Sequence, residues 1–330
     1  MNATDRLAQA PTVQRARDVL AVTEVLDVQK DVRIRPLEGG ASNENFLVED
    51  GGDRFVLRLA CSTEHAQRFA LDRWDGYEAH QAAAGAGIAP RMRAVALPAG
   101  HTVIDFVDGE VMDQDSIRVG RRLELATVAL KRVHTAPHTD LGGFDALVEI
   151  DRFISIARAE NLRLPDDIES LRQLSAEIRD VFGWVDVPPM LCHNDVQLAN
   201  LIVDAEERMW VIDWEYAGMG NLYFDLAMLV NNAELDRTGI GRVVTVYFGI
   251  DRETDRARIE LERFRSALRE ALWSVVAAPV LTTSWDYAAW AERFFASARR
   301  IAARVAEQGL LAEAGPQTTD KDVFERVMNA

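Results

Sequence analysis

The chain has 330 residues, of which 48% are hydrophobic and 27% are charged, a composition typical of a soluble globular enzyme. Its formal net charge of −16 argues against nucleic acid or an anionic membrane surface as a partner, because both bind clustered lysine and arginine. The same negative charge would suit a cationic substrate.

Cysteine use and apolar content point to a reducing compartment. Cys61 and Cys192 are the only two cysteines, too few for a disulfide framework or a cysteine metal site. The N-terminal residues lack an apolar signal segment, and no apolar run approaches the length of a membrane span. We therefore expect a cytoplasmic protein without membrane insertion; the oligomeric state is left open.

The first third of the chain predicts helices around a small antiparallel sheet. Residues 12–30 place apolar side chains on one side of a helix, and residues 64–86 also have a helical pattern. Gly51 and Gly52 stand between two apolar runs and predict a tight hairpin. The strands are expected at residues 33–37, 46–48, 54–59, 95–97 and 102–107.

Beyond residue 107 the pattern becomes mainly helical. Two short apolar runs at 201–203 and 209–213 predict one further hairpin. The division predicts an α+β protein with a small β lobe over residues 1–107 and a large α-helical lobe over 108–330. The helices of the large lobe are expected at residues 115–135, 147–159, 166–183, 222–233, 253–278 and 285–308.

The second hairpin is bracketed by residues suited to magnesium-dependent phosphoryl transfer. Residues 193–200 read HNDVQLAN, an H-x-D-x-x-x-x-N pattern, and an apolar strand ending in Asp213 follows. Asp195 can accept the proton of a substrate hydroxyl, and Asn200 and Asp213 offer the oxygen ligands that Mg²⁺ prefers. This order of residues is that of a protein-kinase catalytic loop with altered flanks.

These motifs resemble those of the aminoglycoside phosphotransferase/choline kinase superfamily, a branch of the protein-kinase-like fold. Within it, HNDVQLAN and IDWEYAGMGNLYFDLA look most like choline/ethanolamine kinases, because Glu215 and Tyr216 stand where antibiotic kinases usually have glycine. The resemblance implies a two-lobe fold that binds ATP and Mg²⁺ in the cleft. It also implies that residues 105–110 carry the adenine and that Asp195 is the catalytic base.

The nucleotide side of the cleft follows from the same resemblance. Small residues between the first two strands would let backbone N–H groups approach the phosphates. Arg58 stands where a protein kinase has lysine, and Glu78 is its expected carboxylate partner, with Asp75 as the competitor. The residues expected to cover the phosphates are Gly39, Gly40, Ser42 and Asn43.

The acceptor side is expected to hold a small cationic alcohol. A trimethylammonium donates no N–H bonds, so aromatic faces and nearby carboxylates would bind it. The branch often has a second Trp one turn before Trp273, where this chain has Glu270, and an added acid could favour a primary amine such as ethanolamine. The resemblance places Tyr216, Trp273 and Tyr287 in the aromatic box, with Gln197, Glu215, Asp225 and Glu234 as polar candidates.

Three polar residues, Asp225, His193 and His134, are interpreted as structural. The resemblance suggests that Asp225 mainly bonds the catalytic loop backbone, that His193 fixes this loop, and that His134 supports it. The function that follows is ATP- and Mg-dependent O-phosphorylation of choline or ethanolamine. The alternatives are a kinase for another cationic small molecule, such as thiamine or an aminoglycoside, and a nucleotide-binding pseudokinase.

Overall fold

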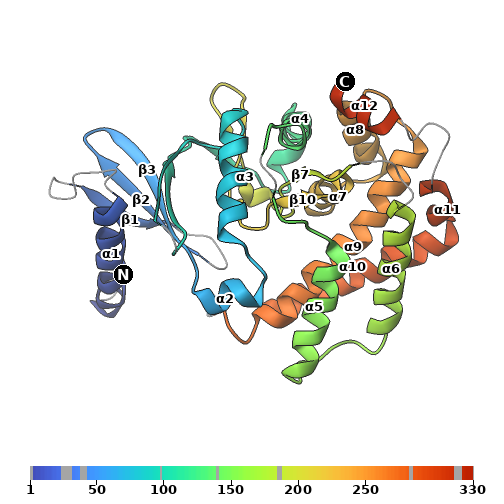
Figure 1. The fold of residues 1–330 in the computed structure, drawn as a ribbon, viewed down its shortest axis with the longest axis horizontal. Helices are drawn as coiled ribbons and strands as arrows, with labels where there is room; N and C mark the ends of the chain where they lie inside the picture. The colour runs from blue at the N-terminus through green and yellow to red at the C-terminus, as the bar shows by residue number, and fades with distance from the viewer. Residues whose placement is uncertain are drawn as a thin grey trace.

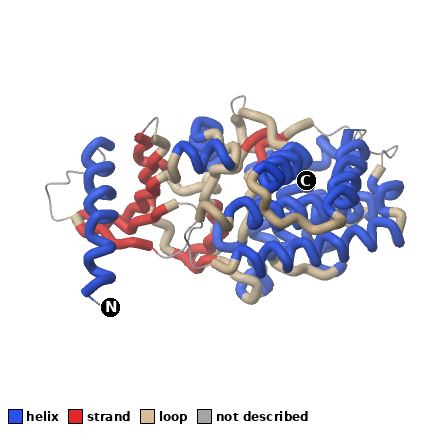
Figure 2. The backbone as a smooth tube through the Cα atoms, turned by 90° about the horizontal axis from the view of Figure 1, so that it is seen from below, coloured by secondary structure: helices blue, strands red, loops and turns tan. Residues whose placement is uncertain are grey.

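The computed structural model describes residues 3–23, 32–37, 43–96, 99–138, 141–183, 188–281, 285–315 and 322–329 (Figure 1). Within these ranges, no helix combines the length and the apolar character that a membrane crossing requires. The strands gather toward the N-terminal end, and helices make up most of the remainder (Figure 2).

The small lobe is built on an antiparallel sheet in the order β1-β2-β3-β5-β4. Gly51 and Gly52 adopt φ values of 58° and 111°, so the tight β2–β3 turn forms where the sequence predicts it. The alternating burial along β3 places one face of the sheet against a core. The strands are β1 Arg33–Leu37, β2 Glu44–Asp50, β3 Asp53–Leu59, β4 Met92–Ala96 and β5 His101–Asp105.

The helix α1 (Ala3–Thr23) covers one face of this sheet. Ala16 and Leu20 are fully buried in a cluster with sheet residues such as Val48 and Leu57. The helix begins earlier than residue 12, and the predicted extension to residue 30 lies partly outside the described residues.

The helix predicted over 64–86 is two helices, α2 (Thr63–Arg68) and α3 (Arg73–Gly85). Ala70 has a left-handed φ of 53°, and the Asp72 side chain accepts hydrogen bonds from the first amides of α3. The intervening bend turns Phe69 into the core of the large lobe, where it packs against Phe153 and Trp273.

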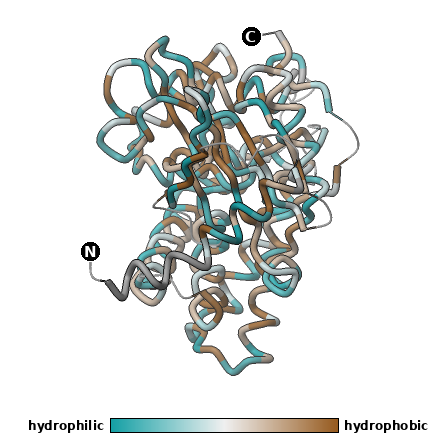
Figure 3. Tube along the Cα trace, turned by 90° about the vertical axis from the view of Figure 1, so that its left-hand side faces the viewer, coloured by the Kyte–Doolittle hydropathy of each residue, from teal (hydrophilic) through white to brown (hydrophobic). Residues whose placement is uncertain are grey.

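The large lobe is arranged around α9, which is buried along most of its length and packs against α5, α7 and α10. Hydrophobic and hydrophilic residues alternate along the helical segments, as expected for amphipathic helices (Figure 3). The helices are α4 Arg122–His134, α5 Ala146–Ala159, α6 Ile168–Gly183, α7 Leu222–Asn232, α8 Arg237–Phe248, α9 Glu253–Ala277, α10 Tyr287–Glu307, α11 Leu310–Ala314 and α12 Asp322–Asn329.

The helix predicted over 115–135 is shorter than expected. A short 3₁₀ turn, η1 (Ser116–Arg118), comes first, and α4 begins only at Arg122. Gly120 lies between them with a left-handed φ of 59°, which a continuous helix does not allow.

Two small sheets hold the two predicted catalytic segments, residues 193–200 and 212–217. Strand β8 (Leu201–Asp204) pairs with β9 (Met209–Val211), as predicted, and β6 (Gly109–Val111) extends this sheet. Strand β7 (Met190–Cys192) pairs with β10 (Gly218–Gly220), a pairing that was not expected from the sequence. The loop 193–200 therefore runs from one small sheet to the other, and the segment 212–217 returns.

The hydrophobic clusters show how the lobes are joined. The five-stranded sheet and α1 share their own cluster, whereas Ala79 and Ala83 of α3 belong to the core that also contains Val211 and Trp214. With Phe69, which follows α2, in the second large-lobe cluster, α2 and α3 both pack onto the large lobe. This packing fixes α2 and α3 relative to the catalytic segments.

We expect Phe69→Ala to lower the free energy of unfolding by about 3–5 kcal/mol, because it empties a fully buried site in the large-lobe core. The matched control is Trp74→Ala, since Trp74 is 53% exposed and its removal should change the free energy by no more than about 0.5 kcal/mol. Denaturant unfolding of both variants measures this. Equal effects would mean that Phe69 does not anchor the helices.

Candidate active site

The carboxylate of Asp225 on α7 holds the backbone at the start of the loop 193–200, the predicted catalytic loop. Its two oxygens accept the backbone N–H groups of His193 and Asn194 at 2.7 and 2.8 Å. His134 Nε2 contacts the same carboxylate at 3.0 Å, and the Tyr247 hydroxyl lies 2.5 Å from His134 Nδ1. Asp225 and His134 thus support the loop, as the sequence analysis expected.

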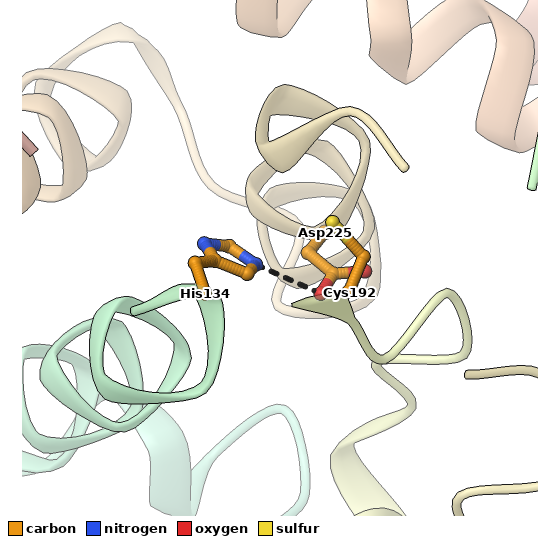
Figure 4. A group of neighbouring side chains, drawn as sticks. All are labelled: His134, Cys192 and Asp225. Carbon is orange, nitrogen blue, oxygen red and sulfur yellow. Dashed lines mark hydrogen bonds and ion pairs between the residues drawn. The ribbon is translucent and has the colours of Figure 1, made fainter. Parts of the chain in front are cut away.

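Figure 4 shows His134 and Asp225 pointing toward each other with Cys192 beside them. Potential ligand atoms of these three residues lie within 4.8 Å of one another, a spacing that a metal ion could use. However, both Asp225 oxygens already accept hydrogen bonds, and burial raises the pKa of the Cys192 thiol well above its usual value. Asp225 and His134 are thus already engaged in holding the loop, so we interpret the group as structural.

His193 fixes the shape of the loop. It is fully buried, its Nε2 donates to the carbonyl of Ile212 at 2.9 Å, and its Nδ1 accepts the Asp195 amide at 3.3 Å. Its ring meets Trp214 edge-on at 4.8 Å. Burial lowers the pKa of His193, so the neutral ring serves as a structural link between the two catalytic segments.

Asp195, near the start of the loop, and Asn200, at its end, lie close together. The Asn200 amide nitrogen donates to the Asp195 backbone carbonyl at 3.0 Å and reaches the carboxylate at 3.4 Å. This orientation leaves the Asn200 amide oxygen as the atom that can face a cation. Burial raises the pKa of Asp195 well above its usual range, and the Glu270 carboxylate adds to the shift.

Asp213 follows β9 and adopts a left-handed backbone with φ of 67°. For a residue other than glycine this conformation is strained, and such strain concentrates at functional sites. Asp195, Asn200 and Asp213 all line one cavity of about 400 Å³. A carboxylate and an amide oxygen facing the same cavity fit a hard divalent cation such as Mg²⁺.

Arg58 of β3 connects the sheet to this site. Its Nη2 lies 2.8 Å from Asp213 Oδ1 and also forms a close ion pair with Glu215. Burial raises the pKa of Asp213 to about 6, and Arg58 opposes that shift. The Asn43 amide donates to Glu215 at 2.9 Å, so two small-lobe residues converge on this one carboxylate.

The expected pairing of Arg58 with a helix carboxylate is wrong. The carboxylates that Arg58 contacts are Asp213 and Glu215, not Glu78. The competitor, Asp75, instead accepts the Gly142 amide at 2.9 Å.

Close packing of α3 explains why Glu215 takes this position. A Cβ atom at Gly76 would lie 3.0 Å from the Trp214 carbonyl oxygen, a tight contact, so glycine favours this close approach of the helix. Glu215 is thereby brought beside the sheet, where Arg58 reaches it. Gly76 within a helical pattern was the available signal. Of the expected phosphate-covering residues, Asn43 lies at the site, and Gly39, Gly40 and Ser42 lie outside the described residues.

The same cavity extends into the large lobe and has an aromatic wall. Tyr216 and Trp273 line it as predicted, and the Trp273 indole N–H donates to the Tyr216 hydroxyl at 3.0 Å. Tyr287 is not part of the lining: it is buried behind Trp273, with ring centroids 6.1 Å apart. The aromatic residues that the sequence analysis missed are Trp285, Trp290 and Phe294.

The position of Tyr287 along α10 explains why it does not line the cavity as predicted. Tyr287 is the first residue of this helix, and Trp290 follows three residues later on an adjacent part of its surface. The side chain nearer to the helix N-terminus packs into the core, while the later one reaches the cavity. The apolar spacing of the segment was visible in the sequence, but its rotation about the helix axis was not.

The polar lining is more ordered than the sequence analysis foresaw. Glu270 accepts Arg269 Nη1 at 3.1 Å and the Gln197 amide at 3.3 Å, and burial raises its pKa. Gln197 therefore lines the cavity while hydrogen-bonded to Glu270. Glu234 contacts Arg293 at 2.6 Å, and of these two only Arg293 is part of the lining.

Two lobes of α+β structure with an Asp–Asn–Asp set facing one cavity define a kinase-like phosphotransferase. A model of the phosphotransferase enzyme family matches residues 33–261, and the chain belongs to this family.

Similar proteins agree with this assignment. LicA of Haemophilus influenzae is 22% identical over 250 residues, covering 72% of this chain and 71% of that protein. Ethanolamine kinase 2 of Mus musculus is 22% identical over 292 residues, covering 79% and 74%. A solved choline/ethanolamine kinase family protein from Mesorhizobium loti superposes with a TM-score of 0.78 at 23% identity, covering 92% of this chain and 98% of that one. The predicted fold class is confirmed.

Acid should destabilise the protein through His80, which lies beside Trp214. His80 is 6% exposed, its Nε2 contacts the Pro90 carbonyl at 2.8 Å, and burial lowers its pKa to about 4. The unfolded chain binds the proton first as pH falls. The contribution of the neutral, buried His80 ring to the free energy of unfolding is therefore complete above about pH 6.5. It falls toward pH 4 by about 1.4 kcal/mol per pH unit.

We expect His80→Gln, which can keep a donor to Pro90, to flatten the dependence of the free energy of unfolding on pH between about 4 and 6.5. Urea unfolding at several pH values measures the slope. The control His138→Gln removes an exposed histidine and should leave the slope unchanged. A wild-type slope in the His80 variant would contradict the assignment.

Proposed function

We propose that this phosphotransferase uses ATP and Mg²⁺ to phosphorylate the hydroxyl of a small cationic alcohol, choline or ethanolamine. The observation that carries the proposal is the single cavity that Asp195 shares with metal-type oxygens on one side and an acidic, aromatic wall on the other. Phosphoryl transfer needs these parts next to each other, because the reaction depends on positioning and on charge stabilisation.

Asp195 is proposed to orient the acceptor hydroxyl and to take its proton. Burial and the neighbouring Glu270 raise its pKa well above the usual range, which makes its deprotonated form a stronger proton acceptor. Because Asp195 and Glu270 interact, protons leave them as a pair rather than independently. The Asn200 amide restrains the Asp195 side chain in the orientation that faces the cavity.

The nucleotide is proposed to lie between the lobes of residues 1–107 and 108–330. Asn200 and Asp213 would hold Mg²⁺, which when bound neutralises charge on the phosphates. Arg58 supplies a positive charge at the same point, held by two carboxylates. Gly39, Gly40, Ser42 and Asn43 stay predictions for the phosphate-covering loop, and residues 105–110 for the adenine.

The acceptor is proposed to bind against the aromatic wall. Indole and phenol faces attract a cation, and the carboxylate of Glu270 adds negative charge beside Asp195. The likeness to ethanolamine kinase 2 supports an amino alcohol. Thiamine and aminoglycosides are the alternative acceptors, and a pseudokinase would be expected to lack one of Asp195, Asn200 and Asp213.

Measuring ADP release with Mg-ATP and choline, ethanolamine, thiamine or kanamycin tests the proposal. We expect turnover of an amino alcohol that disappears when EDTA removes Mg²⁺. Asp195→Asn should lower kcat by about 100-fold or more while ATP still binds, because it removes the proton acceptor but keeps the side-chain shape. Asp166→Asn, at an exposed position, is the control and should behave as wild type.

Each contrary result has a distinct meaning. Wild-type turnover by Asp195→Asn would sink the proposed role of Asp195. Turnover of thiamine or kanamycin alone would retain the mechanism and replace the acceptor. Binding of Mg-ATP without transfer to any alcohol would support the pseudokinase.

A further inference from the structure

The acceptor wall already contains a cation of the protein's own. Arg269 lies near the C-terminal end of α9 and is 1% exposed. Its guanidinium carbon lies 4.6 Å from the centre of the Tyr216 ring and 5.5 Å from that of Phe144. The aromatic residue expected to bind a substrate cation is therefore occupied on one face by an arginine.

The charge of Arg269 is balanced by the neighbouring residue. Nη1 donates to Glu270 at 3.1 Å, whereas Nε and Nη2 are buried without a hydrogen-bond partner in the described part of the chain. Burial acts to lower the pKa of Arg269, but the surrounding negative groups, Glu270 first, raise it above the usual value. The guanidinium is thus a fixed positive charge, stacked on rings and paired on one edge.

This arrangement changes what the wall can bind. A second cation against Tyr216 would be repelled by Arg269, and the Tyr216 hydroxyl is already bonded to the Trp273 indole. Arg269 contacts one Glu270 oxygen, Gln197 contacts the other, and the Trp290 indole also hydrogen-bonds this carboxylate. Glu270 still retains acceptor capacity, because each carboxylate oxygen can accept more than one donor. At Tyr216 and Glu270, the free capacity is therefore for hydrogen-bond donors rather than for a methylated cation.

Resting on the proposed function, we propose that Arg269 and Glu270 determine acceptor specificity by selecting a primary ammonium over a quaternary one. Arg269 occupies Tyr216 and orients Glu270, and Glu270 accepts N–H bonds from the ammonium. A trimethylammonium has no N–H group to give, so it would leave the remaining acceptor capacity of Glu270 unused, and its methyl groups would meet the positive charge of Arg269 without compensation. Trp273 and Trp290 then act as apolar walls for the carbon chain.

The methylation series of ethanolamine tests this directly. Ethanolamine, its N-methyl and N,N-dimethyl derivatives, and choline lose their N–H groups one at a time while the hydroxyl stays the same. With Mg-ATP and the wild-type protein, we expect kcat/KM to fall along the series, by about 10-fold or more from ethanolamine to choline. Calorimetric binding of the same four amines should follow the same order.

Removing the Arg269–Glu270 ion pair should weaken the preference for ethanolamine over choline. Arg269→Leu/Glu270→Gln removes a buried ion pair without leaving one charge alone. The choline-to-ethanolamine ratio of kcat/KM should rise by about 10-fold, because the Tyr216 face becomes free for a cation. The matched control is Arg265→Leu/Glu262→Gln, a buried pair at 2.8 Å on the same helix that lines a different cavity. It should leave the ratio unchanged.

The outcomes separate this inference from the proposed function. A wild-type protein that prefers choline, or a double variant with an unchanged ratio, would overturn the specificity role while leaving the kinase intact. If the double variant does not fold, the wild-type series decides alone. If none of the four amines is phosphorylated but binding still favours ethanolamine, the proposed function fails and the role of Arg269 and Glu270 stands. If there is neither phosphorylation nor a binding preference for ethanolamine, both the proposed function and the specificity role fail.

Discussion

The geometry of the whole site depends on one buried carboxylate, that of Asp225. It accepts two successive backbone N–H groups, and Asn194, the second residue of the loop, is thereby kept in a left-handed conformation with φ of 60°. The Asn194 amide also donates to the Tyr216 carbonyl at 3.1 Å. One carboxylate therefore sets the position of Asp195 and, through Asn194, of the acceptor wall. Buried polar groups of this kind are stabilising only when every donor and acceptor is satisfied.

The second constraint joins the lobes. Arg58 comes from the sheet, and both carboxylates that it contacts come from the segment after β9. A carboxylate on the small-lobe helix would have tied the cation to its own lobe. With Glu215 in that role, the proposed nucleotide side and the proposed acceptor side share one residue, because Glu215 also lines the cavity that contains Asp195 and Trp273. A change in the position of the sheet would thus alter the cavity directly through Glu215.

Much of the secondary structure was predictable, because periodicity reports which face of an element is buried. The β2–β3 hairpin followed from two glycines, and α9 followed from an apolar pattern along its length. The break between α2 and α3 was not predicted, since Ala70 has no conformational preference for a left-handed φ. The burial of Phe69 in the large-lobe core and the Asp72 cap of α3 stabilise that bend.

The sequence by itself determined that Asp195, Asn200 and Asp213, the proposed catalytic set, lie together, because these residues bracket the β8–β9 hairpin and local spacing fixes their relation. Tertiary structure alone decided which carboxylate meets Arg58 and which aromatic side chains face the acceptor. Those choices depend on how closely α3 approaches the catalytic segment and on the rotation of α9 and α10 about their axes. Such rotations are set by packing between residues far apart in the chain, which no local pattern records.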